Sequence, residues 1–166
     1  MQLRTARPIF SSIRRDELRE ERVHDGYKMA KKPGEPAVCT SCGAVFHRGR
    51  WQWSRVPPDS TAVTCSACRR ARDHFPAGFV HIGGEYFAKH RDEVLQLLRH
   101  REATEKADHP MARIIDIEER PTGVEVTTTD IHLARNLGRA LLQACQGVLR
   151  YHYNRADNHL RVTWER

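Results

Sequence analysis

The sequence predicts an α+β fold in which a small cysteine-rich module precedes a sheet covered by two helices. Three observations predict it. Four of the five cysteines form two C-x-x-C pairs within residues 39–68, a Pro-Ala-Gly turn signal follows this stretch, and residues 79–166 alternate strand-like and helix-like patterns. A chain of 166 residues can hold one modest domain and a small module. We therefore expect an N-terminal extension at 1–34, a cysteine module at 35–78 and an α+β domain at 79–166.

The N-terminal extension, residues 1–34, is rich in charged and poor in apolar side chains. Its apolar area is too small to offset the chain entropy that folding removes, so we expect a basic, flexible segment with a short helix over residues 16–23. A disordered tail and an arm that binds a partner explain this composition equally well.

The elements of the α+β domain are predicted from apolar periodicity. They are, in order, a strand at 79–82, a helix at 86–106, strands at 112–118 and 124–128, a helix at 131–145, and strands at 148–153 and 160–164. The Gly83-Gly84 pair supplies a turn, Pro110 follows the first helix, and residues 120–123 carry a hairpin signal. Two helices over one largely antiparallel sheet predict a ferredoxin-like βαββαβ order with an additional strand.

The start of the second helix carries the most enzyme-like run of the sequence, residues 127–132, where hydroxyls, a carboxylate and an imidazole meet. A helix N-terminus can bind an anion, so a phosphate or RNA contact is one interpretation. Capping by Thr129 or Asp130 explains the same residues, and we prefer it. Cys145 falls on the apolar face of this helix, where we expect it to be buried as a small hydrophobic residue.

The two C-x-x-C pairs consist of Cys39, Cys42, Cys65 and Cys68. Each pair lets two thiolates reach one ion from a tight turn, and two such turns complete the tetrahedral shell typical of zinc. Four cysteines leave no position open for water, so the spacing predicts a zinc ribbon with one structural Zn²⁺ ion.

Two alternatives exist for the metal site. A thioredoxin-like redox pair is disfavoured because neither C-x-x-C is expected to open a helix within a βαβ unit. His47 and His74 lie close to the cysteines in the sequence. Because four thiolates already complete the shell, we expect neither histidine to be a ligand.

Basic and aromatic side chains surround the cysteine pairs. The first 78 residues hold 15 Lys and Arg against 8 Asp and Glu, whereas the remaining residues hold 13 of each. The candidate RNA-binding residues are Arg48, Arg50, Trp51, Trp53, Arg69, Arg70 and Arg72. Guanidinium groups suit phosphate oxygens and aromatic rings suit unstacked bases, so this set predicts RNA binding. Ordinary solvation is the alternative for the arginines, and packing is the preferred interpretation for the tryptophans.

The usual signatures of catalysis and of membrane insertion are missing from the sequence. It contains no glycine-rich phosphate loop, no H-E-x-x-H and no G-x-S-x-G. We therefore predict a protein that is not an enzyme and has no small-molecule substrate. It also lacks a secretory signal pattern and a long apolar run, and its cysteine pairs suit a reducing compartment, so we expect the cytoplasm and no membrane partner.

Several of these segments match a known family in type and order. They are residues 65–69, residues 78–82, the helix with Phe87 and Leu95, the strand with Arg113, Ile114 and Ile117, residues 123–126, residues 128–130, and the helix that starts near Ala134. Over residues 37–155 the chain resembles the N-terminal region of the large-ribosomal-subunit export adaptors of eukaryotes and archaea, the family named for nonsense-mediated decay protein three. It resembles more closely, over its whole length, a bacterial family of small zinc-ribbon proteins.

The resemblance to the export adaptors implies association with the ribosome, since that family binds the large subunit through ribosomal RNA and proteins. This sequence has one four-cysteine site where the family carries more zinc-binding cysteines, and it ends before the family's later β-rich domains. Export is therefore not implied. We expect binding to the large ribosomal subunit or its RNA during assembly, dormancy or stress.

Two other functions are kept as alternatives. One is a DNA-associated regulator or protein-interaction adaptor that uses the zinc ribbon as a platform. The other, ranked last, is a hydrolase acting on RNA or a peptidyl-nucleotide through Asp130 and His132.

Overall fold

The computed structural model describes residue 27 and residues 32–166, so the helix expected at 16–23 lies outside the described residues. The strands are β1 (Ala37–Cys39), β2 (Val45–His47), β3 (Arg50–Gln52), β4 (Thr61–Val63), β5 (Gly78–Gly83), β6 (Ile114–Arg120), β7 (Gly123–Thr128), β8 (Val148–Asn154) and β9 (His159–Glu165). The helices are α1 (Ser66–Arg72), α2 (Glu85–Lys89), α3 (Arg91–Asp108) and α4 (Ile131–Cys145). The α+β class is confirmed.

The smaller sheet has the order β3-β2-β1-β4 and is built from strands of three residues. Strand β1 pairs antiparallel with β2 and parallel with β4. The β2–β3 turn is held from outside, because the Glu35 carboxylate accepts hydrogen bonds from the backbone N–H groups of Arg48 (2.8 Å) and Gly49 (2.9 Å). Such short strands bury little apolar surface, so this sheet depends on other contacts for stability.

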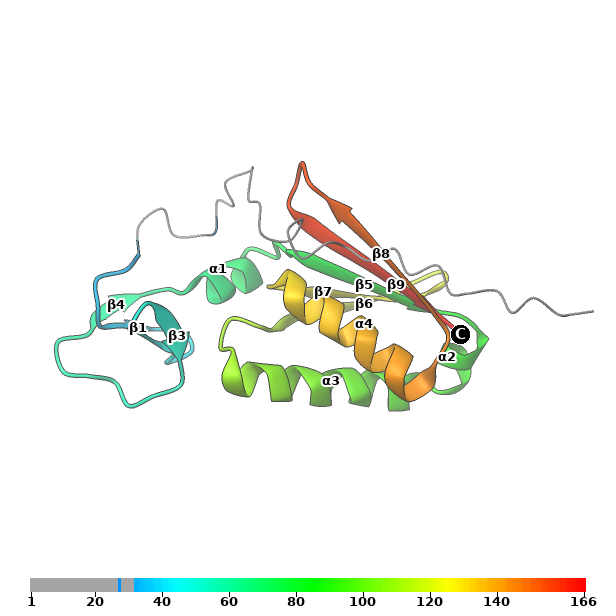
Figure 1. The fold of residues 1–166 in the computed structure, drawn as a ribbon, viewed down its shortest axis with the longest axis horizontal. Helices are drawn as coiled ribbons and strands as arrows, with labels where there is room; N and C mark the ends of the chain where they lie inside the picture. The colour runs from blue at the N-terminus through cyan, green and yellow to red at the C-terminus, as the bar shows by residue number, and fades with distance from the viewer. Residues whose placement is uncertain (1–26, 28–31) are drawn as a thin grey trace, which may run out of the picture.

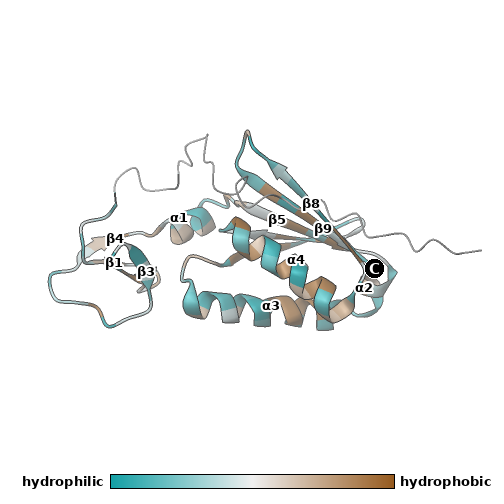
Figure 2. Ribbon diagram, viewed as in Figure 1, coloured by the Kyte–Doolittle hydropathy of each residue, from teal (hydrophilic) through white to brown (hydrophobic). Residues whose placement is uncertain are grey.

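The larger sheet has the order β6-β7-β5-β9-β8, and helices α3 and α4 cover one face of it (Figure 1). Alternation along the strands directs one set of apolar side chains toward the helices. On the central strands these include Val80 and Ile82 of β5 and Trp164 of β9, all fully buried. Helix α4 contributes six buried residues, and Figure 2 shows hydrophobic and hydrophilic residues in turn along it. The main core therefore lies between this sheet and its two helices.

The ferredoxin-like order is not confirmed, because β9 pairs parallel with β5. The first half follows the expected order: β5 and β6 are separated by β7, which pairs antiparallel with both. After α4, however, the chain forms the edge strand β8 first and then returns in β9, which inserts beside β5. The additional strand is thus β8 at the edge, and the sheet is mixed.

The first predicted helix, expected without interruption over 86–106, consists of two helices. His90 lies between α2 and α3 with φ −121° and ψ 28°, outside the helical region. Its ring stacks on Tyr86 with centroids 4.3 Å apart, and the break gives α3 a new N-terminus with Asp92 and Glu93 in its first turn. Acidic side chains favour such a terminus electrostatically. Apolar spacing continues across the break, so the sequence pattern conceals it.

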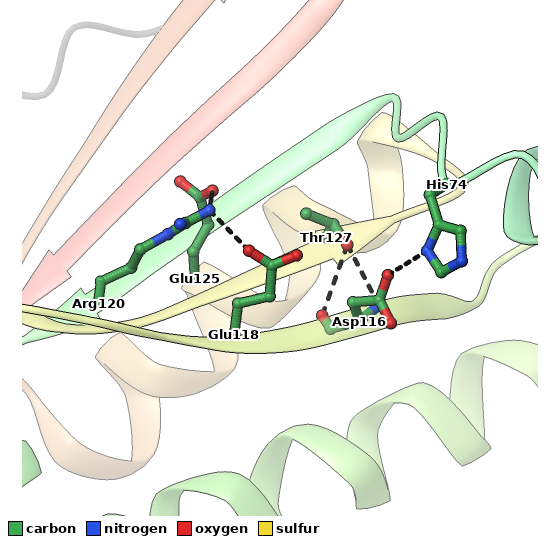
Figure 3. A network of polar contacts seen from close by, with 6 residues as sticks. All are labelled: His74, Asp116, Glu118, Arg120, Glu125 and Thr127. Carbon is green, nitrogen blue, oxygen red and sulfur yellow. Dashed lines mark hydrogen bonds and ion pairs between the residues drawn. The ribbon is translucent and has the colours of Figure 1, made fainter.

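The opposite face of the larger sheet carries a polar network at β6 and β7 (Figure 3). The Arg120 guanidinium contacts Glu118 at 2.8 Å and Glu125 at 2.9 Å. His74, from the segment after α1, lies 2.7 Å from the Asp116 carboxylate. This contact ties the connection between the two sheets to β6.

Candidate metal centre and the residues around it

Two backbone turns hold the four cysteines. Cys39 ends β1, and Gly43 closes the first turn by donating its N–H to the Cys39 carbonyl at 2.8 Å. Gly43 has φ +77°, a conformation that a side chain disfavours. Cys65 is the N-cap of α1, and its sulfur accepts a hydrogen bond from the N–H of Cys68 at 3.4 Å. Helix α1 was not predicted, because cysteine is not among the usual capping residues.

The four sulfur atoms form one cluster in which all lie within 4.8 Å of one another. The Sγ atoms of Cys39 and Cys68 are 3.8 Å apart, and those of Cys42 and Cys65 are 3.9 Å apart. A tetrahedron with metal–sulfur bonds of 2.3 Å, the value for zinc, has edges of about 3.8 Å. The four thiols could therefore hold a metal ion, as the cysteine spacing predicts.

Backbone N–H groups prepare one thiol for binding a metal. The N–H of Cys65 donates to the Cys39 sulfur at 3.3 Å. Burial acts to raise the pKa of Cys39, but backbone hydrogen bonds from Cys65, Cys42 and Ser41 outweigh it and lower the pKa to about 6. Burial raises the pKa of Cys65 above its ordinary value. Of these two thiols, Cys39 therefore ionises more readily. Because a cysteine binds a metal as the thiolate, Cys39 is the better prepared ligand of the two.

Arg113, which is not among the site residues predicted from the sequence, lies against the cluster. Its Nη1 donates to the Cys68 sulfur at 3.2 Å. Burial acts to lower the pKa of Arg113, but the sulfurs of Cys42 and Cys68 outweigh it, so the pKa is raised. Forty-four residues of intervening chain separate Cys68 from Arg113, so only the tertiary structure could reveal this contact.

The two candidate tryptophans contact other parts of the chain, Trp51 by packing and Trp53 by a hydrogen bond. Trp51 is half-buried against the cysteine cluster, and its ring lies 5.4 Å from that of Phe46. Trp53 is 40% exposed, but its Nε1 donates to the Lys106 carbonyl of α3 at 2.7 Å. Both side chains thus stabilise the structure around the smaller sheet.

Of the candidate arginines, Arg48 and Arg50 are exposed at the β2–β3 turn. Those of α1 have partners within the chain. Arg70 is only 6% exposed, and its guanidinium lies 4.8 Å from the Tyr27 ring centroid and 5.6 Å from that of Phe75.

Arg69 and Arg72 also contact residues close to α1. Arg69 donates to the Tyr27 carbonyl at 2.9 Å, and Arg72 forms an ion pair with Asp73 at 2.8 Å. The candidate arginines therefore divide into three exposed residues, Arg48, Arg50 and Arg72, and two that contact Tyr27, Arg69 and Arg70.

The remaining candidate residues lie outside the cluster. Asp130 is the N-cap of α4 and accepts a hydrogen bond from the Leu133 N–H at 3.3 Å, which confirms the capping interpretation. His132 is exposed, and Cys145 is buried at the main core, as expected. His74 pairs with Asp116 instead of approaching the cysteines.

Comparisons of the chain with protein-family models, with curated proteins and with solved structures find no match. Among the helices of residues 32–166, none has the length and apolar character needed to cross a membrane.

Proposed function

We propose that the chain is a non-enzymatic zinc protein of the cytoplasm that binds ribosomal RNA, with the large ribosomal subunit as its partner. The four-sulfur cluster carries the metal part of this proposal, because two of its sulfur–sulfur distances, 3.8 and 3.9 Å, match those of a zinc tetrahedron. The cluster consists of four cysteines and, among the described residues, includes no histidine or carboxylate. This closed donor set favours a structural role for the metal.

The RNA part of the proposal is supported by charge. The chain has a net charge of +7, and its whole excess lies in the first 78 residues. Arg48 and Arg50 extend from one turn of the small sheet and are exposed. A turn that is fixed by Glu35 and presents two guanidinium groups suits the phosphates of a folded RNA.

The experiment is sedimentation of cell lysate through sucrose gradients at low and moderate salt, with the protein followed by immunoblot and metal measured on the purified protein. We expect one zinc per chain and co-migration with large subunits that is lost as salt rises. Salt dependence is the slope of the logarithm of the binding constant against the logarithm of salt concentration. Replacing Arg48 and Arg50 together by Gln should make this slope shallower by about 0.7 to 0.9 per lost phosphate contact in binding to purified subunits.

The matched control replaces Arg91 and Arg150 by Gln. These two arginines pair with Glu119 and Glu165 on the larger sheet, so the control removes the same formal charge elsewhere. The proposal is contradicted if the protein stays at the top of the gradient in growing, starved and stressed cells. Capture of duplex DNA in preference to ribosomes would instead support a DNA-associated regulator.

A further inference from the structure

We propose that Arg113 is a positioning residue for the metal centre, which compensates its charge and fixes the cysteine module to the start of α4. This inference rests on the metal site of the proposed function and extends it to a residue outside the four cysteines. Four thiolates around one Zn²⁺ ion leave excess negative charge, and a partly buried cluster needs a cation or N–H donors to stabilise that charge.

The geometry of the guanidinium fits this role. Nη1 donates to the Cys68 sulfur at 3.2 Å, and Nη2 is buried with no hydrogen-bond partner among the described residues. Cys42 also acts electrostatically on the same group. A buried, unpaired N–H donor is costly in a neutral setting, but a negatively charged cluster beside it offsets that cost.

Hydrogen bonds to residues other than the cysteines hold Arg113 in place. Its Nε donates to the Pro110 carbonyl at 2.9 Å. Its backbone N–H donates to Thr129 Oγ1 at 3.0 Å, and its carbonyl accepts from the Thr129 N–H at 2.9 Å. Thr129 directly precedes Asp130, the N-cap of α4. Arg113 therefore connects the sulfur cluster to the first turn of α4 through Thr129, to which it is hydrogen-bonded, and Asp130, the next residue in the chain.

Two other contacts join the cysteine module to the same part of the chain. Ser66 Oγ lies 3.7 Å from Met111 Sδ, and Trp53 Nε1 donates to the Lys106 carbonyl at 2.7 Å. Neither of them reaches a sulfur of the cluster. Among these three contacts, the one from Arg113 is thus the one that a bound metal would strengthen.

The test measures how fast zinc passes from the purified full-length protein to a chromophoric chelator. Arg113→Gln should speed this transfer by about 10- to 100-fold, the factor by which metal affinity falls when a residue that orients metal ligands is removed. Arg113→Lys keeps the charge but loses the planar fork, so its rate should lie between those of Arg113→Gln and the wild type. Arg101→Gln is the control, since Arg101 pairs with Glu105 at 2.7 Å. It should release zinc at the wild-type rate.

A second measurement, hydrogen exchange on the wild-type protein with and without zinc, tests the connection even if Arg113→Gln does not fold. Zinc removal should reduce the protection of the amides at Thr129 and Leu133, while the amides of β9 stay protected. Unchanged protection at Thr129, or wild-type release from both Arg113 variants, would overturn the inference. Absence of zinc from the wild-type protein would instead overturn the proposed metal site itself.

Discussion

Gly138 shows at the scale of one residue how closely α4 packs on the larger sheet. A Cβ atom at this position would lie 2.6 Å from Val162 Cγ1 of β9 and 3.0 Å from Leu149 Cδ1 of β8. Both neighbours are apolar side chains that pack in or against the main core. The absence of a side chain is what lets the helix approach these strands.

We predict that Gly138→Ala destabilises the protein although alanine is the better helix former. The gain in helix propensity is about 1 kcal/mol, whereas overpacking a core costs about 1–3 kcal/mol. Denaturant unfolding should show a net loss of up to about 2 kcal/mol. Gln143→Ala, at an exposed position of the same helix, should change stability by less than about 0.5 kcal/mol. A more stable Gly138→Ala variant would contradict the close packing.

At the scale of an element, the start of α4 depends on one side chain. Asp130 Oδ2 accepts a hydrogen bond from the Leu133 N–H, and the preceding Thr128 donates from Oγ1 to the Asp130 carbonyl at 2.8 Å. These bonds hold the chain as it leaves β7 and enters the helix. They account for Thr128 and Asp130 in the polar run that resembles an active site in the sequence.

We predict that Asp130→Ala lowers the free energy of unfolding by about 1 kcal/mol, because it removes the acceptor for an otherwise unpaired helix N–H. Asp130→Asn keeps an acceptor and should be close to the wild type. Thermal unfolding followed by circular dichroism distinguishes the two variants. Equal stability of Asp130→Ala and the wild type would show that the cap contributes nothing.

At the scale of the whole molecule, the two sheets differ in what stabilises them. The larger sheet and its helices bury a continuous apolar core that includes Leu137, Leu141 and Trp164. The buried residues grouped around the metal site are Cys39, Cys65 and Ala67. These three residues bury little apolar surface, so a metal held by the four cysteines would supply much of the free energy that offsets the conformational entropy of this module.

We therefore predict that chelation unfolds the smaller sheet and leaves the larger one intact. Hydrogen exchange monitored by mass spectrometry should show lost protection in β1, β2 and β4 after chelator treatment, with little change in β5 and β9. Restoring zinc should restore the protection. Simultaneous loss of protection in both sheets would indicate that the chain unfolds as one unit.

The sequence by itself determined the features that depend on local spacing. The C-x-x-C pairs place two thiols on each turn, and apolar periodicity identified the five strands of the larger sheet and helix α4. These patterns repeat over neighbouring residues, so no knowledge of distant contacts is required. The four-cysteine cluster could be predicted for the same reason, since each half of it is a local motif.

Only the tertiary structure decided which distant residues meet. The parallel pairing of β9 with β5 arises because the chain first forms the edge strand β8 and then returns beside β5, and strand periodicity carries no information about pairing partners. In the sequence, Arg69 and Arg70 resemble exposed phosphate contacts. In the fold, Arg69 donates to the Tyr27 carbonyl and Arg70 lies over the rings of Tyr27 and Phe75. The contact of Arg113 with Cys68 likewise arises because folding joins two segments that are far apart in the chain. Local chemistry fixes what each residue can do, and packing selects the partner with which it does so.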